Sequence, residues 1–258
     1  GLGGRIPAMS RYVGSNEFRG AEFIDVDMSA ALFREVDLSG ARMYGVLLTG
    51  ADIDGDLRGL RLNGVEVAPL VEAELDRLHP ERTKLRATTP AGMREAWEVL
   101  TAMWAQTLER VAAMHEADLH RSVNEEWSFT QTLRHLVFVT DLWLGHAVLG
   151  EPRPFHPLGL PASFITVDET SGIDVDAAPT FLEVIRARDD RVNQVRTFLA
   201  EVTQEELDRV REPNPAPNGP APAARTAASC LRVIFNDEWA HHQFAVRDLA
   251  LIEAERRQ

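Results

Sequence analysis

The sequence predicts a multidomain α and β protein, in which a short repeat region precedes a set of long helices. Two observations predict this organisation. Between residues 18 and 53 a large apolar residue recurs every five positions, which fits neither the helical period of 3.6 nor the strand period of 2. From residue 90 onward apolar residues recur with helical spacing, and most of these stretches begin at a Ser or Thr that can cap a helix.

Composition fits a globular protein and argues against some partners. The chain has 258 residues, 45% of them hydrophobic, and no apolar run approaches the roughly 20 residues that cross a bilayer. We therefore expect a cytoplasmic protein that does not bind membranes. The formal net charge of −13 would repel a phosphate backbone, which argues against direct binding of nucleic acid. The single cysteine, Cys230, excludes an internal disulfide, and we expect it to be a buried small hydrophobe.

The N-terminal repeat consists of two columns of residues. A small residue, Ala and Val in alternation, stands two positions before each large residue from Phe23 onward. The large residues are Phe18, Phe23, Met28, Phe33, Leu38, Met43, Leu48 and Ile53. The spacing then slips to four before it resumes at Leu57, Leu62 and Val67. Over about residues 16–67 this pattern resembles the pentapeptide-repeat family, which implies a short right-handed quadrilateral β-helix with both columns stacked inside.

We divide the chain into a repeat domain (residues 1–68), a short helix with a polar linker (69–87) and a helical domain (88–258). Thr89 and Pro90 begin the first long helix, which we expect to run to about residue 119.

The remaining helices have their own start signals. Capping boxes at Ser128 and Thr180 begin the second and third long helices, and Thr203 begins a minor one. The last helix spans about residues 226–253. A long connection, residues 151–179, separates the second and third helices, and we expect residues 212–222 to form an extended link before the last helix.

Two fragments about a hundred residues apart contain residues of the types that can bind metal ions. Glu238 and His242 are four positions apart in the last helix, so they lie within about 40° of each other on one face. His135 in the second helix adds an imidazole, which makes three ligands with one coordination position open. His241 is rotated by about 100° from His242, and we expect it outside the ligand set. The spacing alone also fits a helical core in which hydrogen bonds satisfy these histidines.

The helical part resembles the DinB-like superfamily over about residues 88–256. The resemblance rests on a histidine in the second helix after a Trp-Ser cap, on the long crossover, and on residues 236–249 of the last helix. It implies a DinB-like four-helix bundle that holds a divalent metal. Most members use two histidines in the last helix, whereas this chain has Glu238 in the first of those places.

With Glu238 in that place, the ligand set is similar to that of the mycothiol-dependent maleylpyruvate isomerases, in which His, Glu and His hold zinc. The resemblance implies that His135, Glu238 and His242 are the ligands, that zinc is the metal, with nickel or iron as alternatives, and that mycothiol is a co-substrate. Trp127 and Trp239 flank these ligands in sequence, and we expect them to shape the pocket or to belong to the core.

Two classes of function remain open. The first is a metal-dependent thiol S-transferase or isomerase, in which the metal activates a thiol or a water molecule and no side chain is assigned to catalysis. The second is a non-catalytic interaction protein, in which the repeats bind a protein partner and the helices form a scaffold. A homodimer is compatible with either class.

Overall fold

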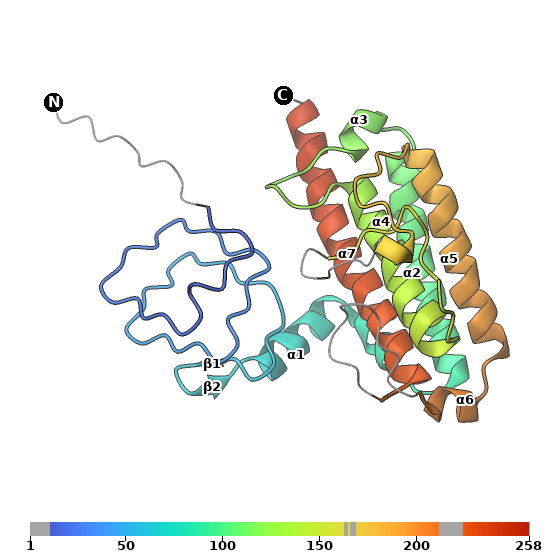
Figure 1. Cartoon of the computed structure of the whole chain (residues 1–258), viewed down its shortest axis with the longest axis horizontal. Coiled ribbons are helices and arrows are strands. Elements are labelled where there is room, and N and C mark those ends of the chain that lie inside the picture. The colour runs from blue at the N-terminus through green and yellow to red at the C-terminus, as the bar shows by residue number, and fades with distance from the viewer. Residues whose placement is uncertain (1–10, 163–164, 166–168, 212–223, 258) are drawn as a thin grey trace. The chain divides into compact units, whose positions relative to one another are not determined.

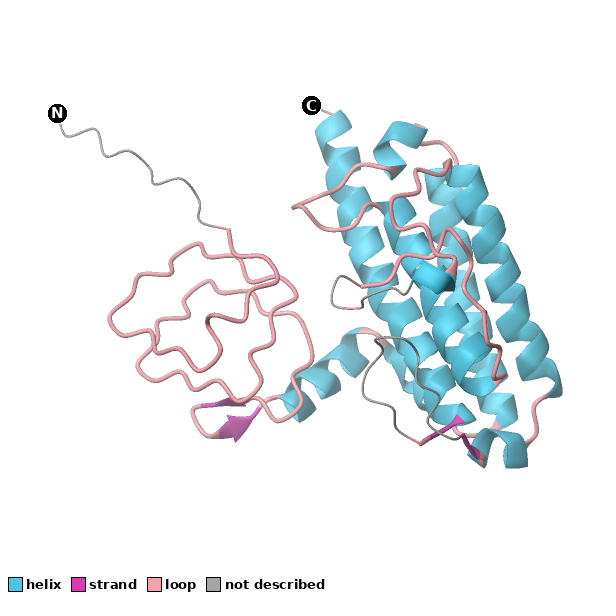
Figure 2. Cartoon of the chain, in the orientation of Figure 1, coloured by secondary structure: helices cyan, strands magenta, loops and turns pink. Residues whose placement is uncertain are grey.

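The structure is a computed structural model that describes residues 11–162, 165, 169–211 and 224–257. The chain divides into two compact units, Gly1–Val46 and Leu47–Gln258, and each is described by itself. Helices account for most of the chain from residue 68 onward, as Figure 2 shows. Among the described residues, no helix is long and apolar enough to cross a membrane.

The repeat period corresponds to a corner of the chain at every fifth residue. A hydrogen bond from an alanine N–H to the carbonyl three residues earlier closes a turn at every tenth residue. The donors are Ala21, Ala31, Ala41 and Ala51. The third residue of each turn has a positive φ, 75° at Gly20 and 61° at Ala30, as in a type II turn. The chain bends again midway between these turns. Five residues therefore form one side between two corners, and not a turn of helix.

The large residues of the repeat do not form a buried core. From Phe18 to Ile53 their exposed fractions lie between 40% and 58%, and no described residue before Leu85 is buried. The predicted stacking inside a β-helix is therefore not confirmed. A coil of repeats buries its interior only against neighbouring coils, and so short a repeat region offers few of them.

A hairpin follows the repeat. Strand β1 (Arg61–Leu62) pairs antiparallel with β2 (Val65–Glu66). Asn63 and Gly64 join them with φ values of 50° and 83°, as in a type I′ turn. The sequence predicted that the repeat resumes here, but Asn-Gly favours a two-residue hairpin, and the chain turns back instead.

Two short helices, which we call the connector (residues 68–86), lead into the helical part. Helix α1 (Ala68–Leu78) agrees with the predicted short helix. The polar stretch after it was predicted to be a linker, but Pro80–Arg86 forms the 3-10 helix η1. Its Leu85 is only 3% exposed and belongs to the main apolar core. The connector is therefore packed against the helical part.

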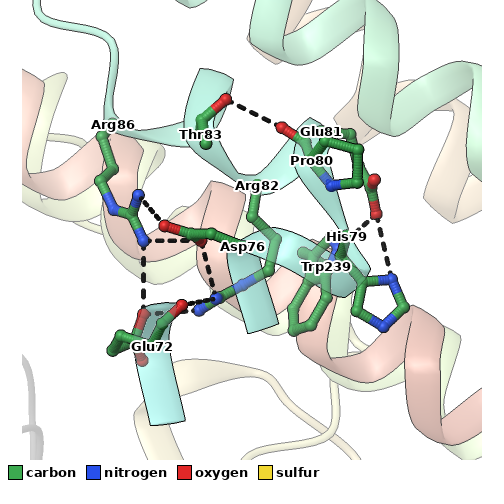
Figure 3. Close-up of polar contacts among 9 residues, drawn as sticks. All are labelled: Glu72, Asp76, His79, Pro80, Glu81, Arg82, Thr83, Arg86 and Trp239. Carbon is green, nitrogen blue, oxygen red and sulfur yellow. Dashed lines mark hydrogen bonds and ion pairs between the residues drawn. The ribbon is translucent and has the colours of Figure 1, made fainter. Parts of the chain in front are cut away.

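Polar contacts hold the two connector helices together and attach them to the last helix, α7 (Ala227–Arg256). Arg82 pairs with Glu72 at 2.7 Å and with Asp76 at 2.9 Å (Figure 3). The Arg82 guanidinium also lies 4.7 Å from the ring centroid of Trp239, whose Nε1 donates to Glu81 at 3.2 Å. Trp239 thus joins α7 to the connector.

Four long helices make up most of the helical part (Figure 1). They are α2 (Pro90–Val111), α4 (Phe129–Thr140), α5 (Phe181–Glu201) and α7. Thr89 caps α2, and complete capping boxes at Ser128 and Thr180 confirm the predicted starts of α4 and α5. Helix α2 ends before the predicted residue 119, and a separate short helix, α3 (Glu116–Leu119), follows it.

The smaller elements connect these helices. They are the π-helix η2 (Asp141–Val148), the 3-10 helix η3 (Glu169–Ser171), α6 (Gln204–Asp208), and the antiparallel pair β3 (Val210–Arg211) and β4 (Arg225–Thr226). The predicted link at residues 212–222 lies outside the described residues.

The apolar core lies among the four long helices, with contacts between α4 and both α5 and α7, and between α2 and both α5 and α7. Trp97 of α2 stacks on Phe235 of α7 with ring centroids 5.8 Å apart. Cys230 is fully buried in this core, which confirms the prediction that it is a small buried hydrophobe. The core fixes the faces that α4 and α7 present to each other.

Candidate metal centre

Two histidines meet where α4 packs on α7. His135 of α4 and His241 of α7 have ring centroids 4.7 Å apart. The capping box at Ser128 fixes the start of α4, and the apolar residues that follow bury this helix, so that His135 is only 7% exposed. The sequence predicted His135 at a metal site but placed His241 outside the ligand set.

Both imidazoles are held by backbone carbonyls. Nδ1 of His135 donates to the carbonyl of Leu160 at 2.9 Å, and Nδ1 of His241 donates to the carbonyl of Asp237 at 2.8 Å. Because a carbonyl only accepts, Nδ1 carries the proton in each ring and Nε2 keeps its lone pair. Burial, together with the His241 ring, lowers the pKa of His135 to about 3, and burial also lowers the pKa of His241. Two neutral imidazoles fixed in this way are typical metal ligands.

The long crossover is anchored beside this pair by Arg134. The buried guanidinium donates to the carbonyls of Leu158 at 2.9 Å, Ala177 at 2.8 Å and Asp174 at 3.1 Å. The backbone N–H of Leu160 also donates to the carbonyl of Arg134 at 3.2 Å. Arg134 thereby holds two segments of the crossover, one of which contains Leu160, the residue whose carbonyl orients His135.

Glu238 and His242 have protein partners on other helices. The Glu238 carboxylate, 1% exposed, accepts from Nη2 of Arg188 in α5 through both oxygens at 2.5 Å. Burial raises the pKa of Glu238, and the guanidinium opposes that shift. Nε2 of His242 lies 2.9 Å from the hydroxyl of Thr107 in α2, and its ring meets Trp104 edge-on at 4.9 Å. The structure therefore does not bring Glu238 and His242 together with His135 as one ligand set.

Asp237 is the acid on the same side of α7 as His241. It lies one turn before that histidine, so the two share a helix face. Burial and the adjacent Glu238 charge raise the pKa of Asp237 to about 7. Sequence reasoning missed this residue although Asp237 and His241 have the same spacing as Glu238 and His242. The available signal was this second acid and histidine pair, displaced by one residue.

Aromatic rings surround the two imidazoles. The Trp127 ring lies 4.5 Å from that of His135 and stacks on His241 at 6.1 Å. Phe244 meets His241 edge-on at 5.9 Å. Trp127 therefore lies beside the histidine pair, whereas Trp239 contacts the connector.

The donor chemistry fits a divalent ion with the two imidazoles as its first ligands. Within the described part of the chain, no three or more His, Cys, Asp or Glu side chains are placed so that they could hold a metal ion together. The acid that shares a helix face with this pair is Asp237, one helical turn from His241.

Comparisons with known proteins agree with the two-part organisation. A family model for the DinB superfamily matches residues 99–245, which is more than half of the chain. A second model, for pentapeptide repeats, matches eight copies over residues 17–55. Searches of curated proteins and of solved structures find no match.

Proposed function

We propose a metal-dependent function for this chain, which belongs to the DinB superfamily. The observation that carries the proposal is the pair of neutral imidazoles on α4 and α7, whose Nδ1 atoms both donate to backbone carbonyls. We also propose that α2, α4, α5 and α7 form a four-helix bundle, and that the repeats form a right-handed quadrilateral β-helix.

We assign His135, His241 and Asp237 as the ligands in place of the set predicted from sequence. The Arg188 contact supports this choice, because a carboxylate bound through both oxygens to a buried guanidinium is a poor candidate for a cation ligand. Asp237 differs from Glu238 in that burial and the adjacent Glu238 charge raise its pKa to about 7, and no cation is among the causes of that shift.

Zinc is the proposed metal, since two imidazoles and one carboxylate with an open position are typical of catalytic zinc sites. A zinc ion there would lower the pKa of a thiol or a water molecule and supply a nucleophile at neutral pH. Leu160 and Arg134 would keep the His135 ring oriented, and the Trp127 ring would restrict water on one side. The proposed activity is that of a thiol S-transferase or isomerase that uses a small thiol of the mycothiol type.

Zinc content and affinity of matched variants test the ligand set. His135→Asn and His241→Asn each keep a donor near Nδ1 but lose Nε2, and Asp237→Asn loses the carboxylate charge. We expect each to weaken zinc binding by on the order of 100-fold or more, beyond the effect of changing a residue outside the ligand set. His242→Asn is the matched control and should bind zinc with nearly unchanged affinity.

Either of two results would contradict this assignment. Wild-type protein without stoichiometric zinc binding would remove the metal-dependent function. Zinc binding that survives in His241→Asn and Asp237→Asn but is lost in His242→Asn and Glu238→Gln would support the ligand set predicted from sequence.

The reaction has a separate test. Zinc-loaded protein is incubated with mycothiol, or another small thiol, and an unsaturated acid, and adduct and isomer are measured by mass spectrometry and absorbance. We expect turnover that the His135→Asn variant lacks. If the loaded protein leaves every thiol and acid unchanged, the metal centre remains and the thiol reaction is withdrawn.

A further inference from the structure

Helix α7 carries two overlapping acid and histidine pairs. Asp237 with His241, and Glu238 with His242, have the same spacing of four and differ by one position along the helix. Successive residues of an α-helix are rotated by 100°, so a rotation of α7 by about 100° about its axis would exchange the pair that faces α4. Helical geometry alone does not choose between the two pairs.

A buried ion pair distinguishes them. Arg188 and Glu238 are 4% and 1% exposed, and both carboxylate oxygens accept from the guanidinium at 2.5 Å. A rotation that carried Glu238 away from α5 would leave two buried charges without partners, which is strongly unfavourable. The ion pair therefore resists rotation of α7.

A second contact, from α2, also opposes rotation of α7. The Thr107 hydroxyl lies 2.9 Å from Nε2 of His242, and the Trp104 ring meets the His242 ring edge-on. The partners of Glu238 and His242 thus belong to α5 and α2, whereas His241 meets α4. The hydroxyl contact is neutral and weaker than the ion pair.

We infer that Arg188 is a positioning residue of the metal centre. By holding Glu238 against α5 it acts together with the apolar core to keep α7 in the rotation in which His241 faces His135. This inference rests on the proposed metal function. Arg188 itself does not contact the metal, and it acts through the helix that carries two of the ligands.

The test uses the full chain and measures zinc affinity and the visible absorption of the Co²⁺ form. Arg188→Met should weaken zinc binding at least tenfold and change the Co²⁺ bands, because α7 loses its ion pair with α5. Arg188→Lys retains the charge and should recover most of the affinity. A lysine variant as weak as the methionine variant would contradict a role for the ion pair.

The double variant Arg188→Met with Glu238→Leu covers the case in which the single variant fails to fold. It leaves no buried charge unpaired, so it should fold, but its zinc affinity should stay at least tenfold reduced because an apolar pair is not directional. The matched control is Arg110→Met with Glu253→Leu, which removes an ion pair between α2 and the far end of α7 and should leave zinc binding unchanged.

Two further outcomes overturn the inference, and one concerns the proposed function instead. Wild-type affinity and Co²⁺ bands in the double variant would show that Arg188 has no positioning role. Tighter zinc binding in Arg188→Met would mean that the substitution frees Glu238 to act as a ligand. If wild-type protein itself binds no zinc, the failure is that of the metal function.

Discussion

Helix α7 presents an acid and a histidine one turn apart on each of two neighbouring faces, and the surroundings of the two pairs differ. Glu238 and His242 meet a guanidinium and a hydroxyl from neighbouring helices. In the other pair, His241 meets a second imidazole and aromatic rings. Side chains of α5 and α2 thus contact the first pair, whereas His241 donates to a carbonyl of its own helix. Residue types and their spacing therefore indicate a class of site, while the contacts with neighbouring helices indicate which residues are available to form it.

Substitution of the two acids should give the largest difference between the faces. In metal-free protein, Glu238→Ala leaves Arg188 buried and unpaired and should cost about 3–5 kcal/mol of stability. Asp237→Ala should cost less than about 1 kcal/mol, since it removes a half-buried charge that burial disfavours. Urea denaturation followed by circular dichroism measures both. Equal losses in the two variants would contradict the distinction.

Zinc should stabilise the protein through one face only. At a free concentration of 100 times Kd, ligand binding adds about 2.7 kcal/mol to the free energy of unfolding. We expect this gain in wild type and in His242→Asn, and no gain in His241→Asn. Thermal unfolding at fixed zinc concentrations measures it. A gain that survives in His241→Asn would argue for ligands on the other face.

A third side of α7 carries Trp239, and its contact with the connector should have an intermediate effect. Arg82→Met removes a cation–π contact and two ion pairs from a largely buried side chain, and it should cost about 1–2 kcal/mol. Arg86→Met is the control, because Arg86 pairs with the same two acids but is half exposed, and it should cost less than about 0.5 kcal/mol. Denaturation midpoints of the two variants test this order.

Loss of one neutral hydrogen bond should have the smallest effect. Thr107→Val keeps the shape of the side chain but removes the hydroxyl beside His242, at a cost of about 1 kcal/mol. Thr101→Val, whose hydroxyl bonds only to its own helix, should change stability by less than about 0.5 kcal/mol. Zinc affinity should be nearly unchanged in both variants, which separates this contact from that of Arg188.

Much of the helical part could be predicted because its signals are local. Ser128 and Thr180 each have a box partner three residues later, and the five-residue repeat produced corners at the expected interval. The hairpin at Asn63 was missed because the same residues also fit a further repeat. The 3-10 helix at Pro80 was missed because the same residues also fit a linker.

The site could be predicted only in part, for a geometric reason. The sequence indicated that His135 lies near this turn of α7, but not which face of the turn meets α4. One residue of register changes the face by 100°, and the deciding partner, Arg188, lies 50 positions away from Glu238. No local pattern in the sequence connects these two residues.

Each face of α7 also has its own indole beside a histidine. Trp127 lies against His135 and His241, and Trp104 meets His242. A paramagnetic ion such as Co²⁺ at the proposed centre should quench the fluorescence of the nearer indole most strongly. Comparison of the emission of Trp127→Phe and Trp104→Phe during a Co²⁺ titration would therefore report optically, without any added dye, which side of the helix the ion occupies.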